Sequence, residues 1–336
     1  MKNPEAVAQA PLTPSASRAH WLYLAVAVLA LGLALIPLFR VRGYYIDVLW
    51  QFCFFAGLAT AWIIVGGFGG MISLGHAAFT GLGAYTSTLL LLRMGVNPWV
   101  GLVIGALVAA AVAGILGYPC FRFGLRADFF ALATLVFGII VYELVNGLPT
   151  ITGGPYGVVV PFAGNNPARF SFTSRSNYFY VAWVYWLLTV AVAYLVQHSR
   201  FGLRLMALRE DEHAAARAGI DVGKVKLAAL MISAALAGLA GTLYAQYYLF
   251  IEPTEIVGLG LSVEIVVIAI VGGISSFLGG TLGALILVPL TQLLNIYLAG
   301  AYAGSDLFIY GLILMIIIRR SPAGIVGLLR RRFPEV

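Results

Sequence analysis

Three ionisable side chains, His76, Glu143 and Glu264, lie inside long apolar runs of the sequence. A charge near the middle of a membrane-spanning helix costs about 2.5 to 3.5 kcal/mol, so such side chains usually face a bundle interior or a cavity. Each of them could make a hydrogen bond between helices, or could bind a proton or a polar group along a path across the membrane. Both possibilities stay open. The full set of candidate path residues is Ser73, His76, Glu143, Asn146, Glu264 and Ser275.

The residue patterns that carry enzymatic chemistry are missing from the sequence. It holds only four histidines, no H-E-x-x-H pair, no paired Cys and His ligands and no G-x-S-x-G elbow. The stretch most similar to a phosphate-binding loop is Gly219 to Lys224. It is one residue shorter than the G-x-x-x-x-G-K-[ST] pattern and lacks the Ser or Thr that binds magnesium. We therefore expect no catalytic residue, metal site or cofactor in this chain. An ATP-driven process would need a separate subunit.

The composition predicts an integral membrane protein built of helices. Apolar residues make up 61% of the chain and charged residues 10%, against roughly 25% charged residues in a typical soluble domain. The apolar runs have the length of helical spans, about 20 residues, and not the roughly 10 alternating residues of barrel strands. The net charge of +7 is better explained by orientation in the membrane than by binding to nucleic acid.

Ten apolar runs are expected to span the lipid bilayer. Residues 1–19 read as a disordered tail, 20–319 as a single transmembrane domain and 320–336 as a basic tail. The ten predicted spans are Trp21 to Phe39, Ile46 to Val65, Ala77 to Leu92, Pro98 to Phe121, Phe129 to Leu148, Tyr178 to Val196, Leu227 to Leu249, Gly260 to Ile274, Thr281 to Leu298 and Leu307 to Ile318.

The distribution of basic residues predicts that both termini are cytoplasmic. An even number of spans places the two termini on one side, and with that side inside, fifteen of the 20 Lys and Arg residues are cytoplasmic. An excess of basic residues on the inside is the usual rule for membrane proteins. The charged loop 199–226 is then cytoplasmic, and the long loop 149–177 lies outside.

The loop 199–226 is the one strongly charged segment of the chain, with six basic and four acidic residues. Arg204 to Ala218 lacks Pro, Gly and Val, which predicts a short helix, and Gly219 stands where a left-handed cap would end it. A charged helix held at a membrane surface is a common docking site for another protein.

Two glycine-rich stretches interrupt the apolar runs, at 66–76 and 272–280. They suit bends, re-entrant segments and close helix packing. The two stretches are similar to each other, so they could belong to an internal repeat, or the similarity could be accidental. The outer loop carries Gly153, Gly154 and Gly157. A loop of this length is often functional, so it could form an outer gate or receive a partner, or it could simply cover the helix ends.

Three sequence stretches resemble the permeases of branched-chain amino acid ABC importers, of the LivM type. They are S-L-G-H-A-A-F-T-G-L-G-A-Y at 73–85, T-G-G-P-x-G at 152–157 and A-L-R-E-D-E-x-A-A-x-x-x-G at 207–219. In ABC importers the cytoplasmic helix carries an E-A-A-x-x-x-G motif that docks on the ATPase. Here His213 occupies the Glu position and Glu212 precedes it, so either could make the main contact. The resemblance implies that the ATPase-coupling residues are Arg209, Glu210, Asp211, Glu212, His213, Ala214, Ala215 and Gly219.

The resemblance also implies a set of partners in a bacterial inner membrane. They are a second, LivH-type permease, two cytoplasmic ATPases that bind ATP and magnesium, and a periplasmic solute-binding protein, with no nucleic acid. It further implies a ten-helix permease domain that gives alternating access to its solute and performs no chemistry of its own.

Three other functions remain possible from the sequence. Similar permeases move urea, short amides or aromatic acids. A different class would be an ion-coupled secondary transporter that uses Glu143 or Glu264 as its proton site. An integral membrane enzyme is a third class, against which the missing reactive cluster argues.

Overall fold

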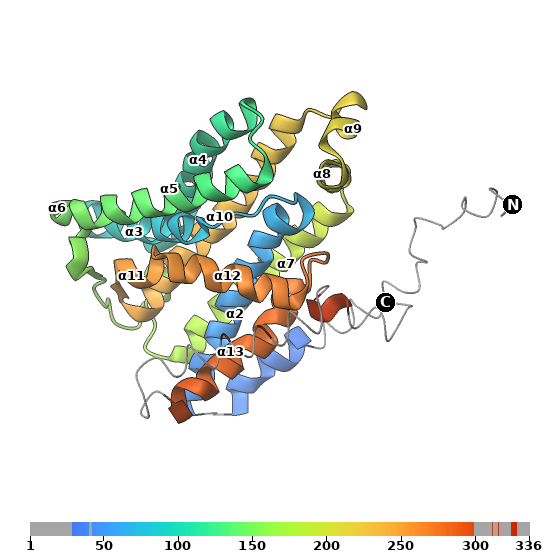
Figure 1. The fold of residues 1–336 in the computed structure, drawn as a ribbon. Helices are drawn as coiled ribbons and strands as arrows, with labels where there is room; N and C mark the ends of the chain where they lie inside the picture. Colours follow the sequence, from blue (N-terminus) through green and yellow to red (C-terminus); the bar gives the residue numbers. More distant parts are fainter. Residues whose placement is uncertain (1–28, 40–41, 299–310, 312–314, 316–323, 328–336) are drawn as a thin grey trace, which may run out of the picture.

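A computed structural model describes residues 29–39, 42–298, 311, 315 and 324–327 (Figure 1). The predicted tail 1–19, the first part of the predicted span Trp21 to Phe39, most of the predicted span Leu307 to Ile318 and most of the tail 320–336 lie outside the described residues. At the start of the described chain, residues 29–35 are α-helical and continue into the 3-10 helix η2 (Ile36–Phe39).

The described chain is mostly helical, as its composition predicts. Six helical segments are long and apolar enough to cross a membrane: Gly43–Phe68, Pro98–Arg122, Ala127–Gly147, Arg175–His198, Val222–Tyr248 and Pro253–Gly272. The main helices are α2 (Gly43–Ile63), α3 (His76–Met94), α4 (Pro98–Arg122), α5 (Ala127–Gly147), α7 (Arg175–His198), α8 (Arg200–Glu210), α9 (Glu212–Arg217), α10 (Val222–Tyr248), α12 (Leu259–Gly272) and α13 (Gly279–Leu298).

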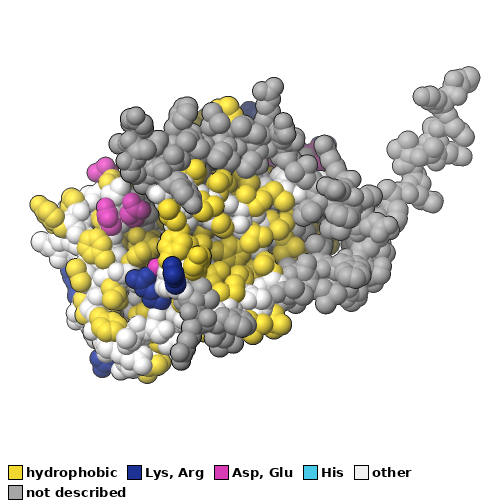
Figure 2. All heavy atoms as spheres, turned by 90° about the horizontal axis from the view of Figure 1, so that it is seen from below, with side chains coloured by type: hydrophobic (Ala, Val, Ile, Leu, Met, Phe, Trp, Pro, Cys, Tyr) yellow, Lys and Arg dark blue, Asp and Glu magenta, His cyan; other side chains and the backbone are white. Residues whose placement is uncertain are grey.

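Helix α2 forms the centre of the bundle and packs against α7, α10, α12 and α13. Its residues from Phe52 to Ile63 are almost all buried, among them Trp62. By contrast, α4 and α5 expose large apolar side chains such as Leu107 and Leu132. Figure 2 shows a face on which hydrophobic side chains cover most of the described surface and charged ones gather in a few places. Such surfaces fit contact with lipid or with another apolar protein.

Small residues bring α3, α4 and α10 into close contact. A Cβ atom at Gly83 would overlap the backbone of Gly238, and one at Gly105 would lie 2.9 Å from the Gly83 carbonyl oxygen. Backbones approach this closely in lipid where glycine removes the side chain. These glycines therefore set the spacing of the three helices.

Both glycine-rich stretches break their helices, as predicted. Helix α2 ends in a turn of π-helix, η3 (Ile64–Phe68), and no helix follows until His76 begins α3. Helix α12 ends at Gly272, and α13 begins at Gly279. The two breaks touch each other, because Gly67 lies directly against the carbonyl of Ile274.

The charged segment forms two helices, so the single helix predicted from Arg204 to Ala218 is wrong. Asp211 is extended, with φ −152° and ψ 105°, and its side chain accepts a hydrogen bond from the Ala214 amide to cap α9. Gly219 has the expected left-handed conformation, at φ +85°. The boundary at 226 is also corrected: α10 starts at Val222, so Lys226 belongs to that helix.

The loop 149–177 is an ordered structure with its own short elements. Its strand β1 (Val158–Val159) pairs antiparallel with β2 (Phe250–Ile251), which follows α10. The remaining elements near this end are α6 (Pro149–Thr152), η4 (Gly154–Tyr156), η5 (Pro167–Arg169) and α11 (Pro253–Ile256). The pairing ties the loop to the end of α10.

Candidate functional site

Helices α8 and α9 form a charged surface at one extremity of the molecule (Figure 1). The residues expected to couple to an ATPase all lie here. Arg209, Glu210, Asp211, His213, Ala214 and Gly219 are exposed, Glu212 is half-buried and Ala215 is buried. Beside them, a hydrogen bond from Lys224 and its positive charge hold the pKa of Asp221 below its usual value.

Arg209 connects this charged surface to the first glycine break. Its guanidinium donates a hydrogen bond of 2.8 Å to the carbonyl oxygen of Gly67. Gly70 has φ +65°, and a Cβ there would lie 2.9 Å from Arg209 Cγ, so glycine makes room for the arginine. The buried Leu205 packs from the same helix, with a methyl group 3.3 Å from where a Gly69 Cβ would stand. Helix α8 thus rests on the break through both polar and apolar contacts.

Glu212 and His213, the two candidates for the main ATPase contact, have different surroundings. The Glu212 carboxylate forms an ion pair with the Lys226 ammonium, with 2.5 Å between Oε2 and Nζ, and the Lys226 side chain is only 8% exposed. The exposed His213 side chain makes no hydrogen bond or ion pair in the described part of the chain, although its carbonyl accepts one from Arg217. The Glu212 carboxylate is therefore already paired within the subunit, and the His213 side chain is exposed and free to meet a partner.

His76 joins three helices at the start of α3. Its Nδ1 lies 3.0 Å from the Ser73 hydroxyl and its Nε2 lies 2.7 Å from the Ser233 hydroxyl on α10. The Ser233 hydroxyl in turn donates to the carbonyl of Ala61 on α2. His76 and Ser73 are both fully buried. This is the arrangement of an interhelical hydrogen-bond network, and neither residue lines the large cavity described next.

A cavity of about 1090 Å³ lies between α2, α5, α10, α12 and α13. Its volume would hold a small organic solute. Aromatic rings and apolar groups form most of its wall, and Glu264, Glu255, Ser262 and the hydrogen-bonded pair Gln51 and Gln292 add polar groups. The aromatic residues of the wall are Trp50, Phe54, Phe55, Tyr142, Tyr244 and Tyr248.

Only one of the six candidate path residues, Glu264, lines this cavity. Glu143 faces outward from α5 into a shallow depression next to Leu144, and Asn146 lies near the loop glycine Gly154. Ser275 lies in the second break, beyond the end of α12, whereas Glu264 lies within that helix. The structure thus separates the candidates, and among the six only Ser73 and His76 share a hydrogen bond in the described part of the chain.

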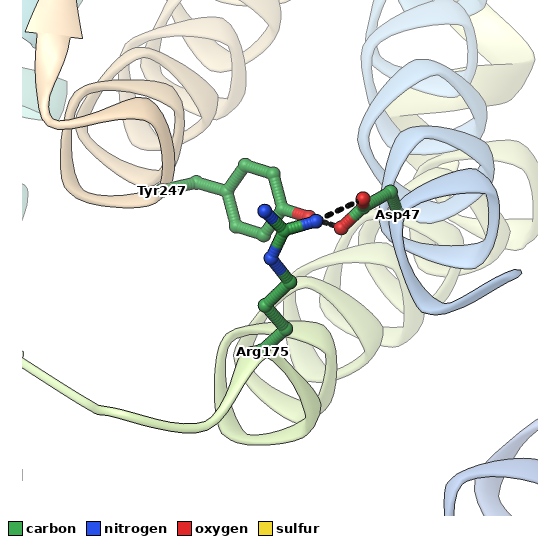
Figure 3. A network of polar contacts seen from close by, with 3 residues as sticks. All are labelled: Asp47, Arg175 and Tyr247. Atoms are coloured by element: carbon green, nitrogen blue, oxygen red, sulfur yellow. Dashed lines mark hydrogen bonds and ion pairs between the residues drawn. The ribbon is translucent and has the colours of Figure 1, made fainter. Parts of the chain in front are cut away.

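A polar network closes the end of the bundle opposite the charged surface (Figure 3). The Asp47 carboxylate on α2 forms an ion pair with Arg175 on α7 and accepts a hydrogen bond from the Tyr247 hydroxyl on α10. The Tyr247 ring stacks on Trp50 of the cavity wall at a centroid distance of 4.0 Å. The network therefore links the first turns of α2 and α7 to the last turn of α10, beside the cavity.

The three loop glycines make the turns that bring β1 to β2. Gly153, Gly154 and Gly157 all have positive φ, between 57° and 75°. A Cβ at Gly157 would overlap the carbonyl of Ile251, which is paired with Val158. The glycines are therefore required for the shape of the loop.

A family model described as the branched-chain amino acid transport system permease component matches residues 44–318. The chain belongs to this permease family. It is 34% identical, over 87% of its own length and 75% of the relative, to the high-affinity branched-chain amino acid transport system permease protein LivM of Escherichia coli (strain K12). The LivM protein of Salmonella typhimurium (strain LT2) is 35% identical, over 80% of this chain and 66% of that relative.

The permease also resembles the second kind of subunit. It is 27% identical to the LivH permease protein of Escherichia coli (strain K12), over 81% of this chain and 91% of that relative. No solved structure matches the permease. The resemblance inferred from the three sequence stretches is confirmed.

Sequence reasoning missed most of the cavity wall of the permease. Trp50 and Phe54, four residues apart on α2, and Tyr244 and Tyr248, four apart on α10, each place two rings on one helical face. That spacing was the available signal. It does not show that the two faces meet, which depends on how α2 packs against α10.

Proposed function

We propose that this permease is the transmembrane subunit of an ATP-driven importer of branched-chain or other hydrophobic amino acids, with alternating access driven by separate ATPases. The contact between Arg209 and Gly67 carries the proposal, because it joins an exposed charged surface to a break in the central helix. A movement that a bound ATPase imposes on α8 and α9 would reach the bundle at the π-helical turn that ends α2.

The proposed assembly has five chains besides lipid. This chain pairs with a LivH-type permease, one ATPase binds at α8 and α9 of this chain and the other binds at the LivH-type permease, and a solute-binding protein docks on the loop 149–177. The two ATPases supply the ATP and magnesium sites. The similarity of the chain to both LivM and LivH proteins supports a pair of related permeases. We place it in a bacterial inner membrane, with ten spans and with both termini in the cytoplasm.

Co-purification from native membranes in mild detergent, followed by an ATPase assay, tests this assignment. We expect the wild-type chain to bring down a second permease and two ATPases. Ala214→Arg, at an exposed site on α9, should lower ATPase recovery, because it blocks docking on this chain. Ala127→Arg, which makes the same change at an exposed site on α5, is the matched control and should leave recovery intact. Equal recovery with both variants would refute docking at α9.

An ion-coupled transporter is the second candidate, because Glu264 lies in the cavity without an ion-pair partner among the described residues. Reconstitution of the purified chain alone decides between them. Uptake driven by a proton gradient without any ATPase would establish the second candidate. An uptake competition series of leucine, urea, acetamide and phenylacetate would separate the solute classes within the family.

A further inference from the structure

The large cavity carries acidic groups that no neighbouring base neutralises. Glu255 and Glu264 line it, and no Lys, Arg or His belongs to its described wall. Neither carboxylate forms an ion pair in the described part of the chain. Glu255 is exposed, but Glu264 is half-buried, and a half-buried carboxylate without a counter-ion is unfavourable. The cavity therefore suits a ligand that brings its own positive charge.

The aromatic part of the wall is continuous beside these carboxylates. Trp50 stacks with Phe54 at 5.1 Å between ring centroids and meets Tyr248 edge-on at 5.5 Å, and Tyr248 lies 4.6 Å from Tyr244. The face of an aromatic ring attracts an ammonium group, and the rings also offer a large surface to an apolar side chain. Acid and aromatic groups together recognise an ammonium on an apolar body.

The first turn of α12 supplies the opposite kind of group. Gly258, Leu259, Gly260 and Leu261 line the cavity, and no side chain caps this helix. The free amides and the dipole of a helix N-terminus favour a carboxylate. Glu264 is five residues beyond Leu259, about 7.5 Å along the axis, and helical side chains lean toward the N-terminus. A donor for an anion and an acceptor for a cation thus lie close together on one helix.

We propose that this cavity binds the zwitterionic head and the apolar side chain of an amino acid. The ammonium lies between Glu264 and the ring of Tyr248, the carboxylate lies at the first turn of α12, and the side chain packs on Trp50 and Phe54. This assignment rests on the proposed function, since an importer of hydrophobic amino acids needs a place where such a solute is held inside the membrane.

Saturation-transfer NMR on the permease, purified in lipid nanodiscs with whatever subunits accompany it and without a binding protein, tests the site directly. The probes are L-leucine, 3-methylbutylamine, which lacks the carboxylate, and 4-methylpentanoate, which lacks the ammonium. We expect signals from leucine and, more weakly, from the amine, and none from the acid. Equal signals from all three, or a signal from the acid alone, would overturn the proposal.

Two matched carboxylate variants locate the binding. Glu264→Gln should weaken leucine binding at least tenfold, whereas Glu143→Gln, which alters a carboxylate that faces away from the cavity, should leave it unchanged. Unchanged binding by Glu264→Gln overturns the site, and so does displacement of leucine by 100 mM sodium, which would show a site for an inorganic cation. Binding is measured whether or not ATPases co-purify, so a chain without ATPases that still binds leucine separates failure of the importer assignment from failure of this one.

Discussion

The Arg209 guanidinium holds the carbonyl of Gly67 at 2.8 Å, across 142 residues of sequence. The carbonyl belongs to the π-helical turn that ends α2, and a turn of this kind leaves backbone groups outside the regular ladder of hydrogen bonds. An arginine of the charged surface therefore hydrogen-bonds a backbone carbonyl at the end of the central helix.

Arg209→Ala should uncouple ATP hydrolysis from transport. Couplings between sites are typically worth about 1 to 3 kcal/mol, so we expect uptake to fall about tenfold while the ATPases still co-purify. Arg204→Ala is the matched control: Arg204 is exposed on the same helix and makes no contact of this kind among the described residues. If Arg209→Ala instead loses ATPase binding, and uptake falls only in proportion to the ATPase lost, Arg209 acts in docking and not in coupling.

Gly67→Ala should destabilise the meeting point of the two breaks. The new methyl group would overlap the Ile274 carbonyl and lie 2.8 Å from a methyl carbon of Ile63, and overpacking of this kind costs about 1 to 3 kcal/mol. Gly114→Ala on α4 is the control, because its nearest neighbour is a Met231 sulfur at 3.5 Å. Thermal unfolding in detergent should separate them, and equal midpoints would show that the breaks can move apart at little cost.

His76→Ala should lower stability more than it alters solute affinity. It leaves a hole at a fully buried site and removes a hydrogen-bond partner from Ser73 and Ser233, at a cost of about 3 kcal/mol. His76→Gln should recover part of the loss, because it keeps a donor and an acceptor. The unfolding midpoint and the KM of uptake are the two measurements. A raised KM with an unchanged midpoint would move His76 to the transport path.

Glu212→Ala should be more harmful than removal of the neighbouring exposed ion pair. It leaves the Lys226 ammonium, on a side chain 8% exposed, without its partner. We expect a loss of about 1 to 2 kcal/mol, less than for a fully buried pair, because the Glu212 side chain is 42% exposed. Lys224→Ala, which breaks an exposed pair with Asp221, is the control and should leave the unfolding midpoint unchanged. The same midpoint in both variants would count against a structural role for the ion pair.

Sequence predicted the parts of this fold that depend on local composition. The apolar runs, the two glycine breaks and the left-handed Gly219 all follow from residue types in one stretch of chain. The division of the charged segment did not follow, because Asp211 can sit inside a helix or cap a new one, and residue types alone do not distinguish the two.

The candidate site depended on which faces of distant helices meet. Glu143 and Glu264 are both acidic residues in apolar helices, and nothing local distinguishes them. In the structure, Glu264 lines the cavity and Glu143 faces outward. Likewise, Arg209 could be assigned to a charged surface, but its partner is a backbone carbonyl, which has no signature in the sequence.

Helix α10 runs without interruption from the Lys226 ion pair to the Tyr247 network. Its 27 residues span about 40 Å. Unlike α2 and α12, which end at the glycine breaks, α10 has no break along its length, so we expect it to move as one rigid element between the two ends of the bundle. We expect a displacement of its charged end to move Tyr244 and Tyr248 with it, whereas α2 and α12 can bend at the breaks where they end. The cavity would then change shape because the wall formed by α10 slides past the walls formed by α2 and α12.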